Sequence, residues 1–435
     1  MKKIIDFQNK DFVENLNHYI ENNRNTSPDI SEKVKIIINN IMDYGDRALS
    51  ELTLKYDNYD IIKEGLCVDE NDVNAAFKEC DKDLISAIDK AAERISDFHE
   101  KQIPSNISYT DGSNVQLGYK WTPLDTVGLY IPGGKASYPS SVIMTAIPAK
   151  IAEVPEVSMC VPCPKGYLNP SVLVAAKICG VKKIYKIGGA QAIAAMTYGT
   201  NTVKKVNKIF GPGNAWVAEA KRQLFGKVGI DMVAGPSEIL VISDDKSNPN
   251  WIAADLLSQA EHDTEAQSIL ITDSLDFAKQ VETAIDNLIK SLKRKEIAET
   301  SWRNNGIIIV LKNLEQSIDI VNKIAPEHLE ISVEKPELIA EKINNAGSIF
   351  LGRFVPEAIG DYIAGPNHVL PTASTARFSS GISTLDYMRR TSMIKCDPDA
   401  LSEIAPSAIK IAENEGLEAH ALSIKIRMNN FTNDK

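Results

Sequence analysis

The sequence lacks the features that mark several classes of protein. It has only six cysteines in 435 residues, without regular spacing, which is typical of reduced thiols in a cytoplasmic protein. No apolar run approaches the length of a membrane span. Polar residues interrupt the start, "MKKIIDFQNKDF", so we expect no secretory signal there. The net charge of −10, with no basic tract to offset it, argues against a nucleic-acid or membrane partner.

One pair of cysteines is closely spaced. Cys160 and Cys163 lie in "VSMCVPCPKG", and no second CxxC is present to complete a zinc site. The pair lies in a strand-like run that ends at Pro164, so the sequence predicts two buried thiols.

The distribution of apolar residues predicts an α/β protein. A chain of 435 residues and 47.8 kDa can form two or three domains. The first 110 residues read as helical, as in "SEKVKIIINNIMDYG". From about residue 120, runs such as "EVSMCV", "KKIYKI" and "EILVIS" alternate with helical segments such as "PSVLVAAKICG". Such repeated β-α units predict parallel sheets covered by helices. The last segment, residues 400–430, reads as helical with breaks at Pro406 and Gly416.

Three strand-like runs end in glycine-rich turns: "GLYIPGGKASYPSS", "KIGGAQAIAAM" and "IFGPGNAWVAEAK". A glycine turn from a strand into a helix lets backbone N–H groups approach a phosphate. None of the three has the GxGxxG pattern, and no acidic residue is clearly placed to hold a ribose. The turns therefore favour a nucleotide or other phosphate ligand without a conventional dinucleotide motif.

Polar residues with unusual local chemistry occur in two short segments. In "LLSQAEHD", Gln259 and His262 share a face if the segment is helical. In "APEHLE", Pro326 suits a first helical turn, which would place Glu327 and His328 at a helix N-terminus. Each histidine taken alone could be structural, but an adjacent carboxylate and imidazole could also act as general base and proton shuttle.

Several long motifs together resemble one family. "GIDMVAGPSEILVIS", "DLLSQAEHD", "APEHLE" and "GSIFLGRFVPEAIGDYIAGPNHVLPT" closely resemble segments of histidinol dehydrogenases, as do "GLYIPGGKASYPSSVIMTAIPAKIA" and "FGPGNAWVAEAKR". The match covers most of the chain and weakens before about residue 110. The resemblance implies a zinc-containing enzyme that oxidises L-histidinol to L-histidine through L-histidinal, in two NAD-dependent steps that end histidine biosynthesis.

The resemblance also implies roles for individual residues. The ligands of one zinc ion per subunit would be Gln259, His262, Asp361 and His420. Glu327 would activate water and His328 would move protons. The substrate would contact the four metal ligands and also Ser237, His328, His368 and Glu415, of which His368 is the least certain. NAD would contact Tyr130, Gln191 and Asn214. In the family, His420 reaches the other subunit, which implies a homodimer with shared active sites.

We expect two Rossmann-like parallel-sheet domains, incomplete and without GxGxxG, with small helical extensions at both ends. The expected units are an N-terminal helical extension (1–25), a discontinuous metal and substrate domain (26–129 with 238–382), an NAD domain (130–237) and a C-terminal helical segment (383–435) that reaches the partner.

Other functions remain open. A thiol-dependent aldehyde dehydrogenase would need a cysteine in these motifs, and none has one. A zinc hydrolase could use the same metal set, but would not need the phosphate-binding turns. A ligand-binding protein would not need the Glu327–His328 pair. A dehydrogenase of another small amino alcohol is the fourth alternative.

Overall fold

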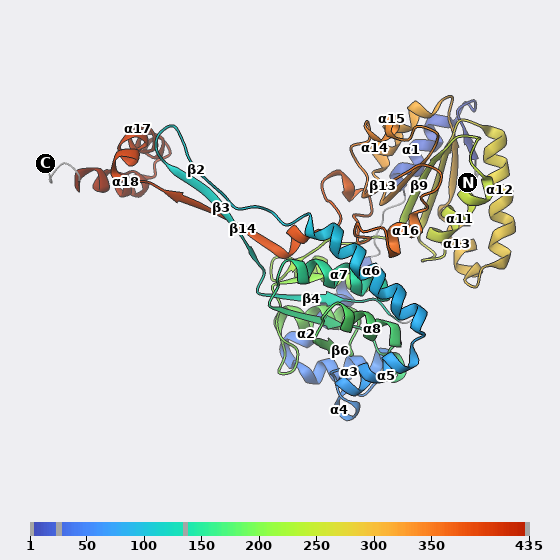
Figure 1. The fold of residues 1–435 in the computed structure, drawn as a ribbon, viewed down its shortest axis with the longest axis horizontal. Coiled ribbons are helices and arrows are strands. Elements are labelled where there is room, and N and C mark those ends of the chain that lie inside the picture. The colour runs from blue at the N-terminus through green and yellow to red at the C-terminus, as the bar shows by residue number, and fades with distance from the viewer. Residues whose placement is uncertain (1–3, 23–27, 134–137, 431–435) are drawn as a thin grey trace.

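The computed structural model describes residues 4–22, 28–133 and 138–430. In these residues the chain forms two α/β lobes that lie side by side, and a long arm that projects away from them (Figure 1). The tip of the arm carries the last two helices.

The first lobe contains a six-stranded parallel sheet. Its strands are β1 (Ile4–Asp6), β9 (Glu238–Ser243), β10 (Gln267–Thr272), β11 (Ile307–Val310), β12 (His328–Ser332) and β13 (Ser348–Leu351), in the order β1-β11-β10-β9-β12-β13. The central strands are continuous apolar runs because helices cover both faces. One face carries α11 (Pro249–Ala260), α12 (Leu275–Leu288) and α13 (Lys295–Asn305), and the other carries α1 (Phe12–Asn22), α14 (Ser317–Ile324) and α15 (Glu337–Ala340).

The second lobe contains a five-stranded parallel sheet. Its strands are β4 (Thr126–Tyr130), β5 (Glu156–Cys160), β6 (Lys183–Tyr185), β7 (Lys208–Phe210) and β8 (Gly229–Ile230), in the order β6-β5-β4-β7-β8. One face carries α5 (Glu70–Glu79), α6 (Lys82–Glu100), α7 (Pro139–Ile151) and α8 (Pro170–Ile178). The other carries α2 (Pro28–Tyr44), α3 (Asp46–Asp57), α9 (Gly189–Tyr198) and α10 (Ala215–Leu224), with the short α4 (Ile61–Glu64) nearby.

The two sheets share one topology. Numbered from its first central strand, each sheet has the order 3-2-1-4-5, which is the order of a Rossmann fold without its sixth strand. In the first lobe, β1 adds an edge strand from the N-terminus. The expected fold of two incomplete Rossmann-like domains is therefore confirmed.

The packing differs from the expected division of the chain. Helices within residues 28–100 pack on the five-stranded sheet and share its cores, so residues 26–129 do not group with 238–382. Residues 4–22 are likewise not a separate extension, because β1 and α1 complete the six-stranded lobe. The N-terminal helices were assigned to the wrong lobe because their apolar stripes show that a face is buried but not which sheet buries it.

The arm is a three-stranded antiparallel sheet followed by two helices. Its strands are β2 (Ile107–Thr110), β3 (Gln116–Pro123) and β14 (Met388–Lys395), and the helices are α17 (Pro398–Asn414) and α18 (Glu418–Asn430). Residues 388–395 were expected to be helical and are a strand instead, because they pair with β3 along its whole length. Pro406 lies inside α17 and does not break it, whereas the break at Gly416 is confirmed.

Two smaller expectations concern cysteines and membranes. Cys160 and Cys163 are both fully buried free thiols, as predicted. Among the described residues, no helix combines the length and apolarity that a bilayer crossing requires.

Candidate active site

His328 is the first residue of β12 and lies at the amino end of the six-stranded sheet, paired with β9 on one side and β13 on the other. The predicted helix N-terminus is therefore wrong. Helix α14 ends at Ile324, Ala325 takes a left-handed conformation with φ 50°, and the chain enters a buried strand after Pro326. A proline soon after a helix end is compatible with such a stop.

Hydrogen bonding fixes the protonation of the neutral His328 ring. Its Nδ1 lies 3.0 Å from the carbonyl oxygen of Glu238. Because a carbonyl oxygen can only accept, Nδ1 carries the proton and Nε2 carries the lone pair. Burial lowers the pKa of His328 to about 3, so the ring stays neutral in the absence of ligands. Nε2 is therefore available as a base.

Glu327 is buried immediately before β12, and its Oε2 accepts a 2.9 Å hydrogen bond from the backbone N–H of Glu238. Burial raises the pKa of Glu327 well above its ordinary value, the hydrogen bond lowers it, and nearby carboxylates, including Asp361, raise it again. A helix N-terminus would favour the ionised carboxylate, but at this position burial acts in the opposite direction and dominates.

Two further carboxylates face His328 from α16 (Glu357–Tyr362). Glu357 Oε1 lies 3.6 Å from His328 Nε2, and Asp361 Oδ1 lies 3.8 Å from the same atom. Burial raises the pKa of both carboxyls, and their mutual repulsion raises that of Glu357 further. A bound cation would favour both carboxylates in the charged form.

Helix α16 is held at its start by residues of the sheet. The backbone N–H of Glu357 donates a 2.5 Å hydrogen bond to Oε1 of Glu330, which is buried within β12. Pro356, at the cap position, provides no side-chain cap, so Glu330 serves as the acceptor from a neighbouring element. Because Glu330 and His328 are two residues apart in one strand, they lie on the same face of the sheet.

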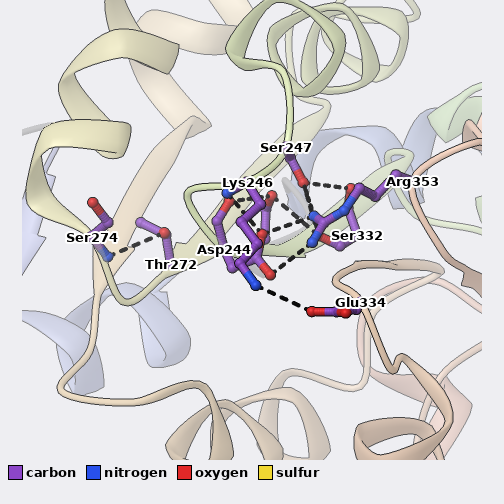
Figure 2. A network of polar contacts seen from close by, with 9 residues as sticks. Asp244, Lys246, Ser247, Thr272, Ser274, Ser332, Glu334 and Arg353 are labelled. Carbon is purple, nitrogen blue, oxygen red and sulfur yellow. Dashed lines mark hydrogen bonds and ion pairs between the residues drawn. The ribbon is translucent and has the colours of Figure 1, made fainter.

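The loop from β13 to α16 is anchored at the opposite edge of the sheet by Arg353 (Figure 2). Its guanidinium donates two 2.8 Å hydrogen bonds to the carboxylate of Asp244. It also donates to the Ser332 carbonyl oxygen at 2.8 Å and to Ser247 Oγ at 2.5 Å. Such a bidentate pair fixes direction as well as distance. The loop that leads to Glu357 is thus tied to β9 and β12.

Helix α11 brings Gln259 and Ser258 toward α16. Ser258 Oγ donates to Glu357 Oε2 at 3.3 Å, and Gln259 is 1% exposed. His262 lies just past the helix, where its backbone N–H donates to the Gln259 carbonyl oxygen at 3.1 Å, so the i, i+3 relation continues through this turn. Burial lowers the pKa of His262, and the charges of Arg294 and His368 lower it further. A neutral imidazole is the form that binds metals.

His368 connects this site with the second lobe. Its Nδ1 donates to the Asp361 carbonyl oxygen at 2.9 Å, and its Nε2 lies 3.5 Å from Oγ of Ser141 in the first turn of α7. Burial lowers the pKa of His368 to about 4. Ser237 directly precedes β9 and therefore lies at the same amino edge of the sheet as His328. The site thus lies where the two lobes meet.

The site contains buried polar atoms without partners. Among the described residues, Gln259 Oε1, His328 Nε2 and Glu357 Oε1 are buried and accept no hydrogen bond. Such atoms are costly unless a ligand or ion satisfies them. His328, Glu357 and Asp361 offer ligand atoms within 4.8 Å of one another. This nitrogen and oxygen donor set fits zinc chemically, and Asp361 belongs both to this set and to the expected one.

Two expected site residues lie elsewhere in this chain. Glu415 directly follows α17 and His420 lies in α18, both exposed at the tip of the arm, away from β12 and α16 (Figure 1). A single chain therefore does not bring them to the other residues.

The expected cofactor residues lie in the second lobe, at the carboxyl ends of its strands. Tyr130 ends β4, and its hydroxyl accepts a 3.0 Å hydrogen bond from the Gly189 N–H at the start of α9. Gln191 is buried in the first turn of the same helix. Asn214 is exposed and caps α10: its side-chain oxygen accepts hydrogen bonds from the backbone N–H groups of Trp216 and Val217. The three residues surround the edge where Rossmann-type sheets bind ligands.

The turn before α9 contains two glycines that its conformation and packing require. Gly189 has φ 65°, and a Cβ atom at Gly188 would lie 2.5 Å from Cγ of Pro162. Both positions therefore require glycine. Part of the turn after β4, residues 134–137, lies outside the described residues.

Sequence reasoning did not find Glu357 and Glu330. Glu357 and Asp361 are spaced i, i+4 behind a proline, which is a usable signal for two acids on one helix face. Glu330 stands between two apolar residues in "HLEIS", and an acid within a buried strand is itself unusual.

Comparisons of the sequence and of the structure with known proteins point to the same family. The family model described as histidinol dehydrogenase matches residues 20–428. The chain is 53% identical over 407 residues to the histidinol dehydrogenase of Rhodospirillum rubrum, covering 93% of this chain and 94% of that one. It is 50% identical over 424 residues to histidinol dehydrogenase 1 of Nostoc sp., covering 96% and 97%. The crystal structure of histidinol dehydrogenase from Elizabethkingia anophelis superposes with a TM-score of 0.93 at 36% identity, covering 99% of this chain and 98% of that one.

Proposed function

The chain belongs to the histidinol dehydrogenase family and is thus an oxidoreductase acting on histidinol; we propose that it oxidises L-histidinol to L-histidine through L-histidinal with NAD and zinc. The single observation that carries the proposal is the buried His328 ring, whose proton is fixed on Nδ1 and whose Nε2 faces two carboxylates. A fixed tautomer with an unpaired lone pair is what a proton acceptor for an alcohol requires.

Gln259, His262 and Asp361 would hold the zinc ion, with His420 supplied by a partner subunit. The unpartnered Oε1 of Gln259 supports this assignment, as does the neutral form that burial imposes on His262. Bound zinc would supply a Lewis acid that grips and orients the substrate. The arm, which carries Glu415 and His420 away from the body of its own chain, supports a homodimer with shared active sites.

His328 would take the hydroxyl proton of L-histidinol at Nε2 during the first oxidation. In the second, the aldehyde must gain water, and Glu327 would take the proton of that water. Its raised pKa makes its ionised form a stronger base than an exposed carboxylate. Glu357, which faces His328 and has an unpartnered oxygen, would be a further polar contact for the substrate. Ser237 and His368 would contact the substrate from the same edge.

Tyr130, Gln191 and Asn214 would bind NAD, the hydride acceptor of both oxidations. Support comes from the contact between Ser141, in the first turn of α7, and His368: it brings the lobe with the glycine turns against the substrate site. We also propose a cytoplasmic location, in line with the six free thiols.

One assay tests the proposal. Purified protein with zinc, L-histidinol and NAD should form two NADH for each L-histidine, and a chelator should abolish the activity until zinc is restored. Hydrolysis of L-histidine amide without NADH would instead assign a zinc hydrolase. Oxidation of another amino alcohol in preference to L-histidinol would contradict the substrate.

A further inference from the structure

A buried ion pair lies behind the cofactor turn of the second lobe. Lys221, in α10, pairs with Asp231, directly after β8, and their side chains are only 2% and 1% exposed. Exposed ion pairs occur in the same lobe, for example Lys204 with Glu156 at 56% and 50% exposure. The Lys221–Asp231 pair differs because both charges have been removed from water.

Both charges contact the backbone of one glycine. Lys221 Nζ donates to the Gly211 carbonyl oxygen at 2.8 Å, and the Gly211 N–H donates to Asp231 Oδ2 at 2.7 Å. The other oxygen of Asp231 accepts from Lys221 and from the Met232 N–H at 2.6 Å. The ion pair therefore satisfies both backbone polar groups of Gly211 and holds this peptide in one orientation.

No residue with a side chain fits in place of Gly211. Its φ is 115°, which side-chain-bearing residues rarely adopt, and a Cβ atom there would collide with the backbone of Tyr130. Tyr130 in turn accepts from the Gly189 N–H. Gly211 thus packs against the residue that links the turn after β7 with the turn before α9.

The arrangement also changes what the turn can offer to a ligand. In phosphate-binding glycine turns, backbone N–H groups point at the phosphate. Here the N–H of Gly211 is taken by the internal carboxylate of Asp231. The carboxylate of Asp231 therefore preorganises the turn from inside the protein. The N–H of Gly211 is not available to donate a hydrogen bond to a phosphate.

A buried ion pair is a costly way to hold a backbone, since apolar residues of similar volume are often as stabilising. Apolar residues could not, however, bind both the N–H and the carbonyl of Gly211. We propose that Lys221 and Asp231 are a positioning pair for the dinucleotide: they hold the Gly211 turn, and through it Tyr130 and Asn214, in the conformation that binds NAD. This inference rests on the proposed cofactor residues.

The test compares two double variants in the full-length protein. Lys221→Met with Asp231→Asn removes both charges at similar volume and leaves no single charge buried. Lys204→Met with Glu156→Gln is the matched control, an exposed pair in the same lobe. For each, the Kd of NAD is measured by calorimetry without substrate, together with zinc content, the Kd of L-histidinol and circular dichroism. Hydrogen exchange of the peptide covering residues 209–215 is measured with and without NAD.

We expect NAD to slow exchange of residues 209–215 in the unsubstituted protein. In the Lys221–Asp231 variant, this peptide should exchange faster and the Kd of NAD should rise about tenfold or more, because preorganisation is lost. Zinc content and L-histidinol binding should not change, and the control should match the unsubstituted protein.

The other outcomes are equally decisive. A folded variant with an unchanged Kd for NAD would overturn the inference. A variant that fails to fold, or that loses zinc and L-histidinol binding together with NAD, would make the pair a general structural element and would also overturn it. If the unsubstituted protein did not bind NAD at all, the proposed cofactor would itself be wrong.

Discussion

The ring of His328 donates a 3.0 Å hydrogen bond from Nδ1 to the backbone carbonyl oxygen of Glu238. The acceptor belongs to the neighbouring strand β9, so the pairing of two central strands sets the direction of the imidazole. A backbone acceptor cannot rotate or titrate, and it therefore holds the tautomer more firmly than a flexible side chain would. The sheet itself thus determines that Nε2 is the ring nitrogen with the available lone pair.

His328→Asn should slow both half-reactions. The amide can still donate to the Glu238 carbonyl, but it has no basic nitrogen in place of Nε2. We expect a loss of about 10²–10⁴-fold, the usual contribution of a general base. Single-turnover measurements that start separately from L-histidinol and L-histidinal would check this. A near-normal rate from either substrate would remove His328 from that half-reaction.

Glu327→Gln should separate the two half-reactions. The substitution keeps the size of the side chain and an oxygen that can accept from the Glu238 N–H, but it removes the basicity. Oxidation of L-histidinal should slow by about 10²–10⁴-fold, because it needs added water, whereas the first oxidation should be largely spared. The same single-turnover assays apply. Equal losses from both substrates would mean that Glu327 positions a ligand and does not activate water.

Glu330→Leu should weaken zinc binding without unfolding the protein. Without the Glu330 acceptor, the first N–H of α16 loses its partner, and Asp361 is carried on that helix. Substitution of residues that support metal ligands typically costs about 10–100-fold in affinity. Zinc affinity can be measured by competition with a chelator.

Glu330→Gln is the informative control for this prediction. Burial and the neighbouring carboxylate of Asp255 raise the pKa of Glu330 well above its ordinary value. A neutral amide keeps the oxygen that accepts from Glu357 and should bind zinc almost normally. The same two substitutions at Glu334, which is exposed on the loop after β12, give a second control. If Glu330→Leu bound zinc as tightly as Glu330→Gln, the cap would have no bearing on the metal.

The sequence predicted the central strands of the two parallel sheets well because they are buried on both faces, and runs such as "EILVIS" favour a buried strand. It failed where an assignment depends on tertiary partners. Pro326 alone makes "APEHLE" look like the start of a helix. The segment is a strand because His328 pairs with β9 on one side and β13 on the other. Residues 388–395 become a strand only because β3 lies beside them.

The candidate site was predictable in part, from the resemblance and not from periodicity. Seven of its expected residues converge at the amino edge of one sheet; these are Ser237, Gln259, His262, Glu327, His328, Asp361 and His368. Glu357 escaped because a carboxylate in the first turn of a helix usually needs no explanation beyond the helix dipole. Its importance follows only from burial and from the 3.6 Å approach to His328.

Mixed subunits should show whether the arm completes a partner's site. His420→Asn changes only the arm, and Glu327→Gln changes only the body, so each homodimer should be defective in L-histidine formation. In a heterodimer of the two variants with exchanged arms, one site receives both substitutions and the other receives neither. Random pairing after coexpression makes half of the dimers mixed, so about a quarter of all sites should be intact in a two-fold symmetric assembly. Steady-state formation of L-histidine by the coexpressed protein, with all three kinds of dimer retained, measures this. Activity no higher than that of the separate homodimers would mean that His420 does not enter the site of a partner, and the shared-site homodimer would have to be abandoned.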